Sequence, residues 1–394
     1  MRRLSKKRLL ALALILVAVA SAFFAISGFF DREPVYQGKT VSDWSRDLNS
    51  PVPSVRSNAT AALQTLGPKA VPYLVRALRK SDPILKKPFQ SFAPRMPLWM
   101  RRGMLRLVKP FQPGNDRLAA ATALVVLATN APAEPLLKSL HDPERGVGYQ
   151  SATALGRLGK PAVPGLITAL NDSDSYVRSM ACYGLGIVGR DAVEAIPGLI
   201  SKFTDSAANI PKQSAYSLGR IGTEAIEPLL EATRSADERV RLHAILALGW
   251  IGPPTSRFAP RLIEMIKDER PAVRAAAVEV LGNIGPFTEE SAASFRAALK
   301  DSDANVRTKA LQSLGKIPQH AKSAMPELLD ALNDKEPQVR GSAAFVLGQI
   351  GPSAESAVPA LKALAKDESD FARSKAQEAL DRIQPRKTPE PTAK

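Results

Sequence analysis

Arginine returns every 33 residues through the C-terminal part of the chain, each time within a similar string such as VRAAAVEVLGNIG, which begins at Val273. A fixed period of about 20–50 residues is the signature of a solenoid or repeat array. One unit of such an array cannot bury its apolar face alone, whereas stacked neighbours can. Ten copies can be counted, at Arg56, Arg117, Gly148, Arg178, Pro211, Arg241, Arg274, Arg307, Arg340 and Arg373.

Each copy is predicted to form two helices. Proline or an acidic residue precedes the arginine-bearing helix, which suits a first helical turn. The second helix is an apolar run that opens near a proline, such as AVPALKALAKD from Ala357. We therefore predict an all-α fold, a right-handed α-solenoid of about ten helix–turn–helix repeats over residues 51–383. Apolar residues around Arg274 recur at helical spacing, namely Val273, Ala277, Val280, Leu281 and Ile284. Glycines suited to the left-handed position after a helix follow the first helix, namely Gly67, Gly159, Gly189, Gly222, Gly252, Gly285 and Gly351.

Two further features of the repeat predict how units stack. A glycine inside the arginine-bearing helix costs about 1 kcal/mol relative to alanine, so we expect it to allow close approach of the next unit. Asp and Arg recur six residues apart, and we expect them to form a ladder of hydrogen bonds between units. Recurrence of the pair in five units favours a structural role over a catalytic one. The glycines are Gly156, Gly186, Gly219, Gly249, Gly282, Gly315 and Gly348, and the pairs are Asp172/Arg178, Asp268/Arg274, Asp301/Arg307, Asp334/Arg340 and Asp367/Arg373.

The pattern Asp-x5-Arg-x2-Ala-x3-Leu-Gly-x-Ile-Gly resembles HEAT repeats, specifically the short HEAT-like repeats first described in bilin lyases. The resemblance covers about residues 51–383 and implies an α-solenoid. Most members of this family are binding scaffolds, some are chromophore lyases, and one relative is a di-iron hydroxylase whose metal is held by repeated His-Glu pairs. None of the three histidines, His141, His243 and His320, is followed by Glu. The resemblance therefore carries no hydroxylase site to this chain.

The sequence contains no recognisable catalytic motif. It has no Gly-rich phosphate loop, nucleophile motif or paired acid cluster. The histidines do not lie in clusters with metal-ligand spacing. We therefore predict no catalytic residue, no cofactor and no metal. The single cysteine, Cys182, cannot form an intramolecular disulfide, and we expect it to be a small buried apolar residue.

The first thirty residues predict export. Residues 1–8, MRRLSKKR, carry five positive charges, and residues 9–30 carry none of either sign. About 20 apolar residues span a bilayer as a helix, and a basic flank stays cytoplasmic. We predict a single-pass transmembrane signal-anchor, with the repeats on the extracytoplasmic (periplasmic) side. The alternative is a cleaved signal peptide, because a small-residue cleavage site ends at Ala22, and it would leave a secreted or periplasmic protein.

Residues 82–115 interrupt the repeats with a basic segment. Four prolines between Pro83 and Pro97 predict an irregular loop. The string LWMRRGMLRLVK that follows them predicts a short helix that is basic on one face. Such a helix could lie on an anionic membrane surface, or it could pack on the first repeats. The candidate membrane-surface residues are Arg101, Arg102, Arg106 and Lys109.

Two segments flank the array. Residues 31–50 are predicted to form a juxtamembrane lead-in helix, with Ser42 as N-cap and Trp44 packed one turn from Leu48. This lead-in resembles those of exported bacterial HEAT-like proteins. Residues 384–394 are polar and proline-rich, so we predict a disordered tail.

The residues that vary around the repeat are where binding is expected. In HEAT-type arrays one helix of each unit lines the concave side, and solenoids bind partners along such a surface. Positions two, five and nine after the arginine site are predicted to point outward, because the apolar face is the repeated one. Aromatic residues and arginine are favoured at binding hot spots. The candidate partner-binding stripe is Arg157, Tyr183, Tyr216, Arg220, His243 and Trp250, and ordinary packing between neighbouring helices is the alternative.

These features favour a non-catalytic, membrane-anchored extracytoplasmic scaffold that binds a protein or peptide partner on the concave face of the solenoid. A solenoid that binds polyanions or the membrane surface is the alternative. It draws on the net charge of +16, five units of which belong to residues 1–8. Export counts against a nucleic-acid partner. A lyase-like enzyme is the third class, and it lacks a motif to support it.

Overall fold

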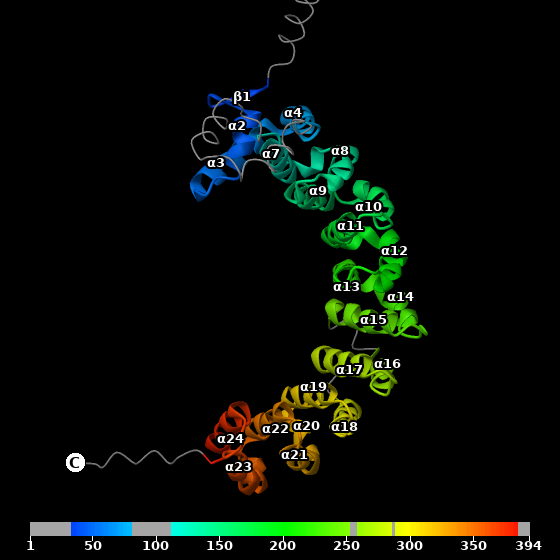
Figure 1. The fold of residues 1–394 in the computed structure, drawn as a ribbon, viewed down its shortest axis with the longest axis vertical. Coiled ribbons are helices and arrows are strands. Elements are labelled where there is room, and N and C mark those ends of the chain that lie inside the picture. The colour runs from blue at the N-terminus through cyan, green and yellow to red at the C-terminus, as the bar shows by residue number, and fades with distance from the viewer. Residues whose placement is uncertain (1–32, 81–111, 253–257, 286–287, 385–394) are drawn as a thin grey trace, which may run out of the picture. The chain divides into compact units, whose positions relative to one another are not determined.

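The computed structural model describes residues 33–80, 112–252, 258–285 and 288–384 (Figure 1). It divides into two compact units, Met1–Leu158 and Gly159–Lys394. The predicted flank 1–8, anchor 9–30 and tail, apart from Gln384, lie outside the described residues, as do residues 82–111 of the basic segment with all four membrane-surface candidates. Within the described ranges, each helix is too short or too polar to cross a bilayer.

Unit 1 begins with a feature that the all-α prediction missed. Two short antiparallel strands pair Val35 with Thr40 and Tyr36 with Lys39. They precede the first of three long helices. The elements are β1 (Val35–Tyr36), β2 (Lys39–Thr40), α2 (Val41–Asp47), α3 (Pro53–Leu66), α4 (Val71–Leu78), α7 (Gln112–Val126), α8 (Ala133–Lys138) and α9 (Arg145–Leu158), with 3-10 helices η1 (Gly67–Ala70), η3 (Ala128–Asn130) and η4 (Ser139–His141).

The lead-in helix α2 is capped two residues before the position that the sequence suggested. Thr40, not Ser42, is the N-cap, because the Thr40 side chain accepts from the Asp43 N–H while the Asp43 carboxylate accepts from the Thr40 N–H. Ser42 lies inside the helix, where its hydroxyl donates to Glu33 at 2.6 Å. Trp44 is buried as expected, and its indole N–H donates to the Tyr36 carbonyl at 3.0 Å. The hairpin and the helix therefore form one packed N-terminal element.

Unit 2 consists of two rows of helices (Figure 1). Consecutive long helices pack side by side, and each short helix packs against the long helix that follows it. The long helices are α11 (Ser175–Val188), α13 (Ile210–Ile221), α15 (Glu238–Ile251), α17 (Pro271–Ile284), α19 (Ala304–Gly315), α22 (Pro337–Ile350) and α24 (Asp370–Ile383). The short row holds α10 (Val163–Ala169), α12 (Ile196–Ser201), α14 (Ile226–Ala232), α16 (Ala259–Met265), α18 (Glu289–Ala298), α20 (Pro318–Ala321), α21 (Met325–Ala331) and α23 (Val358–Leu364). The 3-10 helices are η5 (Lys160–Ala162), η6 (Gly189–Ala195), η7 (Lys202–Thr204), η8 (Thr223–Ala225), η10 (Lys322–Ala324) and η11 (Gly351–Ala357).

The predicted helix signals are confirmed in these elements. The described residues contain ten α-helices of 12 or more residues, three in unit 1 and seven in unit 2, one for each copy of the repeat. Asp174, Asp237 and Asp303 cap long helices with their side chains. All seven glycines predicted to follow a long helix have positive φ. The predicted apolar face of α17 is buried along its whole length.

The repeated Asp and Arg residues form the expected ladder, with a pairing that the sequence did not specify. Nε and Nη2 of Arg307 donate to the two carboxylate oxygens of Asp334 at 2.7 and 2.8 Å, and Nη1 donates to the Asp301 carbonyl at 2.8 Å. The carboxylate partner thus lies 27 residues ahead, in the turn before the next long helix, and the aspartate six residues behind contributes only its main-chain oxygen. The same bidentate pairing joins Arg178 to Asp205, Arg241 to Asp268, Arg274 to Asp301 and Arg340 to Asp367 in unit 2.

The ladder has one gap inside unit 2. From Arg241 to Arg373 each arginine also donates to the main-chain oxygen of the aspartate six residues behind it or, for Arg241, of Ser235. At α13 the arginine position is Pro211. Proline has no side-chain donor, so the α13–α15 junction lacks the bidentate bridge that its neighbours share.

Acid should weaken this ladder. Hydrogen bonds from Arg178 hold the pKa of Asp205 below its usual value, and those from Arg340 do the same for the pKa of Asp367, while burial opposes both shifts. A carboxyl whose pKa is lower in the folded chain stabilises the fold above its unfolded pKa of about 4 and loses that contribution as pH falls below it. We expect the Tm to change little between pH 7 and about 5 and to fall below about pH 4. Thermal melts of the wild type and Asp205→Asn should show a shallower acid dependence in the variant, and equal slopes would contradict the assignment.

Five of the seven glycines that were predicted to allow close approach lie against the next helix. A Cβ on Gly186 would lie 2.8 Å from Ser217 Oγ, and a Cβ on Gly249 would lie 2.8 Å from Val280 Cγ2. A Cβ on Gly348 would lie 3.0 Å from Ala379 Cα. The contact lets the Ser217 hydroxyl donate to the Cys182 carbonyl of the preceding helix at 2.7 Å. Gly219 and Gly282 also have too little space for a Cβ, whereas the nearest atom to a Cβ on Gly315 is 3.6 Å away.

Cys182 lies in this interior as a buried thiol. Its side chain has no exposed surface, and burial raises its pKa to about 12. A thiol in this state is not a nucleophile at neutral pH. The prediction that Cys182 is a small buried residue is therefore confirmed.

Candidate partner-binding surface

The outward face of the long-helix row is made by positions five and nine after the arginine site. In unit 2 these positions are exposed or half-buried in each long helix. The prediction that position two also points outward is wrong for Ala276 and Ser342, which are buried. Position two faces the preceding unit: the His243 ring packs 5.7 Å from the Phe203 ring, and Lys309 pairs with Glu279 at 3.0 Å.

Tyr216 and Trp250 form an exposed aromatic pair on this face. Their ring centroids are 5.2 Å apart and the rings are nearly perpendicular, at 83°. Tyr216 is 40% exposed and Trp250 is 52% exposed, although a Trp of a folded chain is usually mostly buried. Edge-to-face aromatic pairs are favourable at this separation. The two rings come from different helices, α13 and α15, and present one continuous aromatic surface to solvent.

Gly219 is the reason that Trp250 can reach Tyr216. The Cα of Trp250 and its carbonyl carbon would lie 3.3 and 3.2 Å from a Cβ on Gly219, so the α15 backbone runs directly against α13 at this point. Tyr216 is three residues before Gly219, and Arg220 is the next residue after it. Because residues i and i+4 share a helix face, Tyr216 and Arg220 flank the place where Trp250 meets α13. We name Tyr216, Arg220 and Trp250 the aromatic–arginine cluster.

The other residues of the predicted stripe have different surroundings. Tyr183 on α11 is half-buried and makes contacts of its own. His243 is half-buried, its Nδ1 lies 2.7 Å from the Arg239 carbonyl oxygen, and burial lowers its pKa, so its ring is a packing element of α15. Arg157 belongs to unit 1, where its guanidinium donates to the Val125 carbonyl at 3.3 Å. Of the predicted stripe in unit 2, the aromatic–arginine cluster is therefore the part that remains a candidate binding surface.

A second exposed aromatic on the same row was not selected from the sequence. Phe345 on α22 occupies position five, as Tyr216 does on α13, and it is 36% exposed. Lys375 Nζ and Arg382 Cζ lie 5.7 and 5.9 Å from its ring centroid, within the range of cation–π contacts. The signal was present in the positional pattern, but the two cations come from α24 and were not apparent there. Phe345 is thus already covered by charged partners, unlike Trp250.

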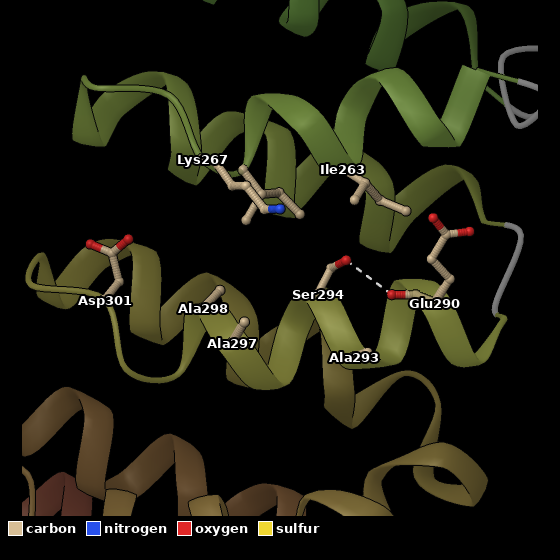
Figure 2. A pocket seen from close by; sticks show the side chains of 9 residues that line it. Ile263, Lys267, Glu290, Ala293, Ser294, Ala297, Ala298 and Asp301 are labelled. Atoms are coloured by element: carbon tan, nitrogen blue, oxygen red, sulfur yellow. Dashed lines mark hydrogen bonds between the residues drawn. The ribbon is translucent and has the colours of Figure 1, made fainter.

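The short-helix row carries a groove between α16 and α18, shown in Figure 2. Its volume is about 390 Å³, and small residues on α18 leave the space open beside Ile263. The Ser294 hydroxyl at its wall is bonded to the Glu290 carbonyl at 2.9 Å. The groove is lined by Ile263, Ile266, Lys267, Glu290, Ala293, Ser294, Ala297, Ala298 and Asp301. Asp301, which also lines the groove, is bonded to Arg274 in the ladder.

Titratable groups do not gather into a metal centre in the part of the chain that the structure describes. No group of three or more His, Cys, Asp or Glu side chains there could hold an ion. The Asp and Arg residues that recur in the repeat are instead used in the ladder.

Comparison with known structures places the fold. The karyopherin Kap121p superimposes with a TM-score of 0.57 at 13% identity, over 89% of this chain and 42% of that chain. Kap121p bound to the extreme C-terminus of the protein phosphatase Cdc14p gives 0.56 at 15% identity, again over 89% of this chain and 42% of that chain. The chain thus spans less than half the length of these karyopherins. At this identity the likeness shows the fold alone.

Comparison by sequence places the family. No curated protein matches the chain. The family profile of HEAT repeats matches overlapping stretches that together run from residue 112 to 393, which is more than half of the chain: 112–186, 133–215, 163–238, 196–259, 259–325 and 325–393. Those stretches contain the long and short helices of unit 2 and the ladder that joins them. The chain belongs to the HEAT-repeat family.

Proposed function

We propose that this protein is a non-catalytic interaction scaffold that binds a protein or peptide partner on the outward face of the long-helix row. The observation that carries the proposal is the aromatic–arginine cluster. Two large aromatic side chains and an arginine are held together in the open by the close approach of α15 to α13. Tyr, Trp and Arg are the residues that most often dominate binding energy at interfaces.

The neighbouring folds support the binding class. Kap121p structures of the same fold include complexes with the C-terminus of Cdc14p and with Nup53p. A curved or straight row of parallel helices offers an extended surface with one set of side chains per repeat, which suits a linear partner. The proposal is that this chain uses the same kind of surface for a partner of its own.

We place the scaffold at a membrane, on the extracytoplasmic side, with residues 9–30 as the anchor and cleavage near Ala22 as the alternative. The uncharged stretch of 22 residues behind five positive charges supports this placement. Alkaline carbonate extraction of membranes and protease treatment of spheroplasts test it. We expect the protein to stay in the membrane pellet and the repeats to be digested in spheroplasts. Repeats that stay protected until the spheroplasts are lysed would overturn the location.

The binding surface is tested by crosslinking and pull-down from native membranes. We expect a partner captured by the wild type to be lost from the triple variant Tyr216→Ala, Arg220→Ala, Trp250→Ala. The matched control is Phe345→Ala, which removes an exposed aromatic from the same row and should keep the partner. Helicity and abundance are checked for each variant. Equal recovery by all three proteins would reject the cluster, and capture that only high salt abolishes would favour the polyanion-binding alternative.

A further inference from the structure

The polar groups of the aromatic–arginine cluster differ from those of the other large side chains in the described ranges. Among the residues that the structure describes, no hydrogen bond or ion pair involves the Tyr216 hydroxyl, the Arg220 guanidinium or the Trp250 indole N–H. This contrasts with Trp44, whose indole N–H donates to a carbonyl, and with the ladder arginines, which use three nitrogens each. Beside two exposed rings, three donors therefore lack an acceptor within the described part of the chain.

This combination defines what a ligand must supply. It must carry hydrogen-bond acceptors for a hydroxyl and an indole N–H, rigid apolar groups for the ring faces, and a carboxylate for the guanidinium. A polyproline II segment meets the first two demands, because its carbonyls make no internal hydrogen bonds and its proline rings dock on aromatic surfaces at low entropic cost. A neighbouring Asp or Glu meets the third by charge-assisted pairing.

We propose that the aromatic–arginine cluster binds a proline-rich segment in which an acidic residue lies between or beside prolines. The assignment rests on the proposed scaffold function and names its partner class. Proline rings would lie in the angle between the Tyr216 and Trp250 rings, which are set at 83°. Main-chain carbonyls of the segment would accept from Tyr216 and Trp250, and its carboxylate would pair with Arg220.

A polyanion fits this place less well. Arg220 is the single cation of the cluster, and burial lowers the pKa of the half-buried His243 on α15. Phosphate-rich ligands need several cations to release counterions. The cluster contains two aromatic side chains and one cation, which favours a peptide with one acidic residue over a polymer with many negative charges.

The chain itself supplies a probe. Its own sequence QPRKTPEPTAK, residues 384–394, contains Pro-Glu-Pro. We would titrate this peptide, and a second peptide with Pro-Glu-Pro inside a run of prolines, into the full-length protein and follow Trp fluorescence and peptide anisotropy. At least one peptide should bind with saturation. Trp250→Ala and replacement of both flanking prolines by alanine should each weaken binding by about tenfold or more.

A charge exchange makes the result specific. Arg220→Glu should weaken binding of the Pro-Glu-Pro peptide and restore binding to a Pro-Lys-Pro version, and Phe345→Ala should leave both unchanged. If the wild type binds neither probe, or if Trp250→Ala and Arg220→Glu bind as tightly as the wild type, the assignment is overturned. A partner still captured from membranes through the cluster, with no peptide binding, would keep the scaffold function and reject this partner class. Loss of both would reject the two together.

Discussion

Replacing Arg307 by alanine is expected to lower the free energy of unfolding of unit 2 by about 3–5 kcal/mol, the range found when one partner of a buried ion pair is removed. The Arg307 side chain is 8% exposed and that of Asp334 is 13% exposed, so the variant leaves a carboxylate in a confined site without its guanidinium. It also leaves the Asp301 and Ser302 carbonyls without their donor. Chemical denaturation followed by circular dichroism measures the loss.

Arg234→Ala is the matched control for this variant. Arg234 pairs with Glu231 one helical turn away, and both side chains are mostly exposed. Surface pairs of this kind contribute about 0–1 kcal/mol. Hydrogen exchange should place the Arg307 effect in α19, α22 and their connection, because solenoid units are stabilised by nearest neighbours. A loss of unfolding free energy no larger than that of Arg234→Ala would mean that the ladder contributes no more to stability than a surface ion pair.

Gly282→Ala is expected to destabilise the protein by about 1–3 kcal/mol, although alanine is the better helix former. The added Cβ would lie 2.6 Å from Ser313 Cβ and 3.3 Å from its Cα, so the whole of α19 must move. The movement would also strain the bond from the buried Ser313 hydroxyl to the Val278 carbonyl, which is 3.2 Å long. The change in Tm reports the effect.

Gly315→Ala, at the same kind of position, is expected to change the stability in the opposite direction. A Cβ there meets the Phe345 and Val346 side chains at 3.6 Å, an ordinary contact. The helix should gain stability by up to about 1 kcal/mol. The double variant Gly282→Ala, Ser313→Gly should recover part of the loss, because it moves the small residue to the other helix. If Gly282→Ala and Gly315→Ala shift the Tm equally, close packing is not why glycine occupies position 282.

Much of the fold could be predicted from the sequence, because each helix signal recurs in many copies of the repeat. The helix at Pro271–Ile284 could be predicted from its proline start, its apolar face and Gly285, and each is a local property of the chain. The hairpin before α2 could not, because Val35–Tyr36 and Lys39–Thr40 are too short to show an alternating pattern. The partner of each ladder aspartate could not either, because the nearest arginine in sequence bonds its carbonyl while the more distant one bonds its carboxylate.

The sequence predicted where the candidate surface lies more accurately than which residues form it. The rule of positions five and nine placed Tyr216, Arg220 and Trp250 outward, since it depends only on helical geometry. Position two, which was also predicted to point outward, selected His243, whose partial burial against Phe203 depends on how tightly the preceding unit stacks. The pairing of Tyr216 with Trp250 depends on Gly219, a residue that sequence reasoning assigned to packing alone.

The gap in the ladder at Pro211 has a mechanical consequence. A bidentate ion pair joins each pair of consecutive long helices from α15 to α24 at the turn before the second helix. The α13–α15 junction lacks this ion pair and is held by apolar contact, including the packing of Trp250 against Gly219. Contact between smooth helix surfaces yields to shear more readily than a directional bridge. Under tension along unit 2 the array should therefore extend first between α13 and α15, the place where the exposed aromatic pair bridges two helices. A ligand that contacts both rings would connect α13 to α15 at this junction. The stiffness of the array would then increase with the fraction of molecules that have ligand bound.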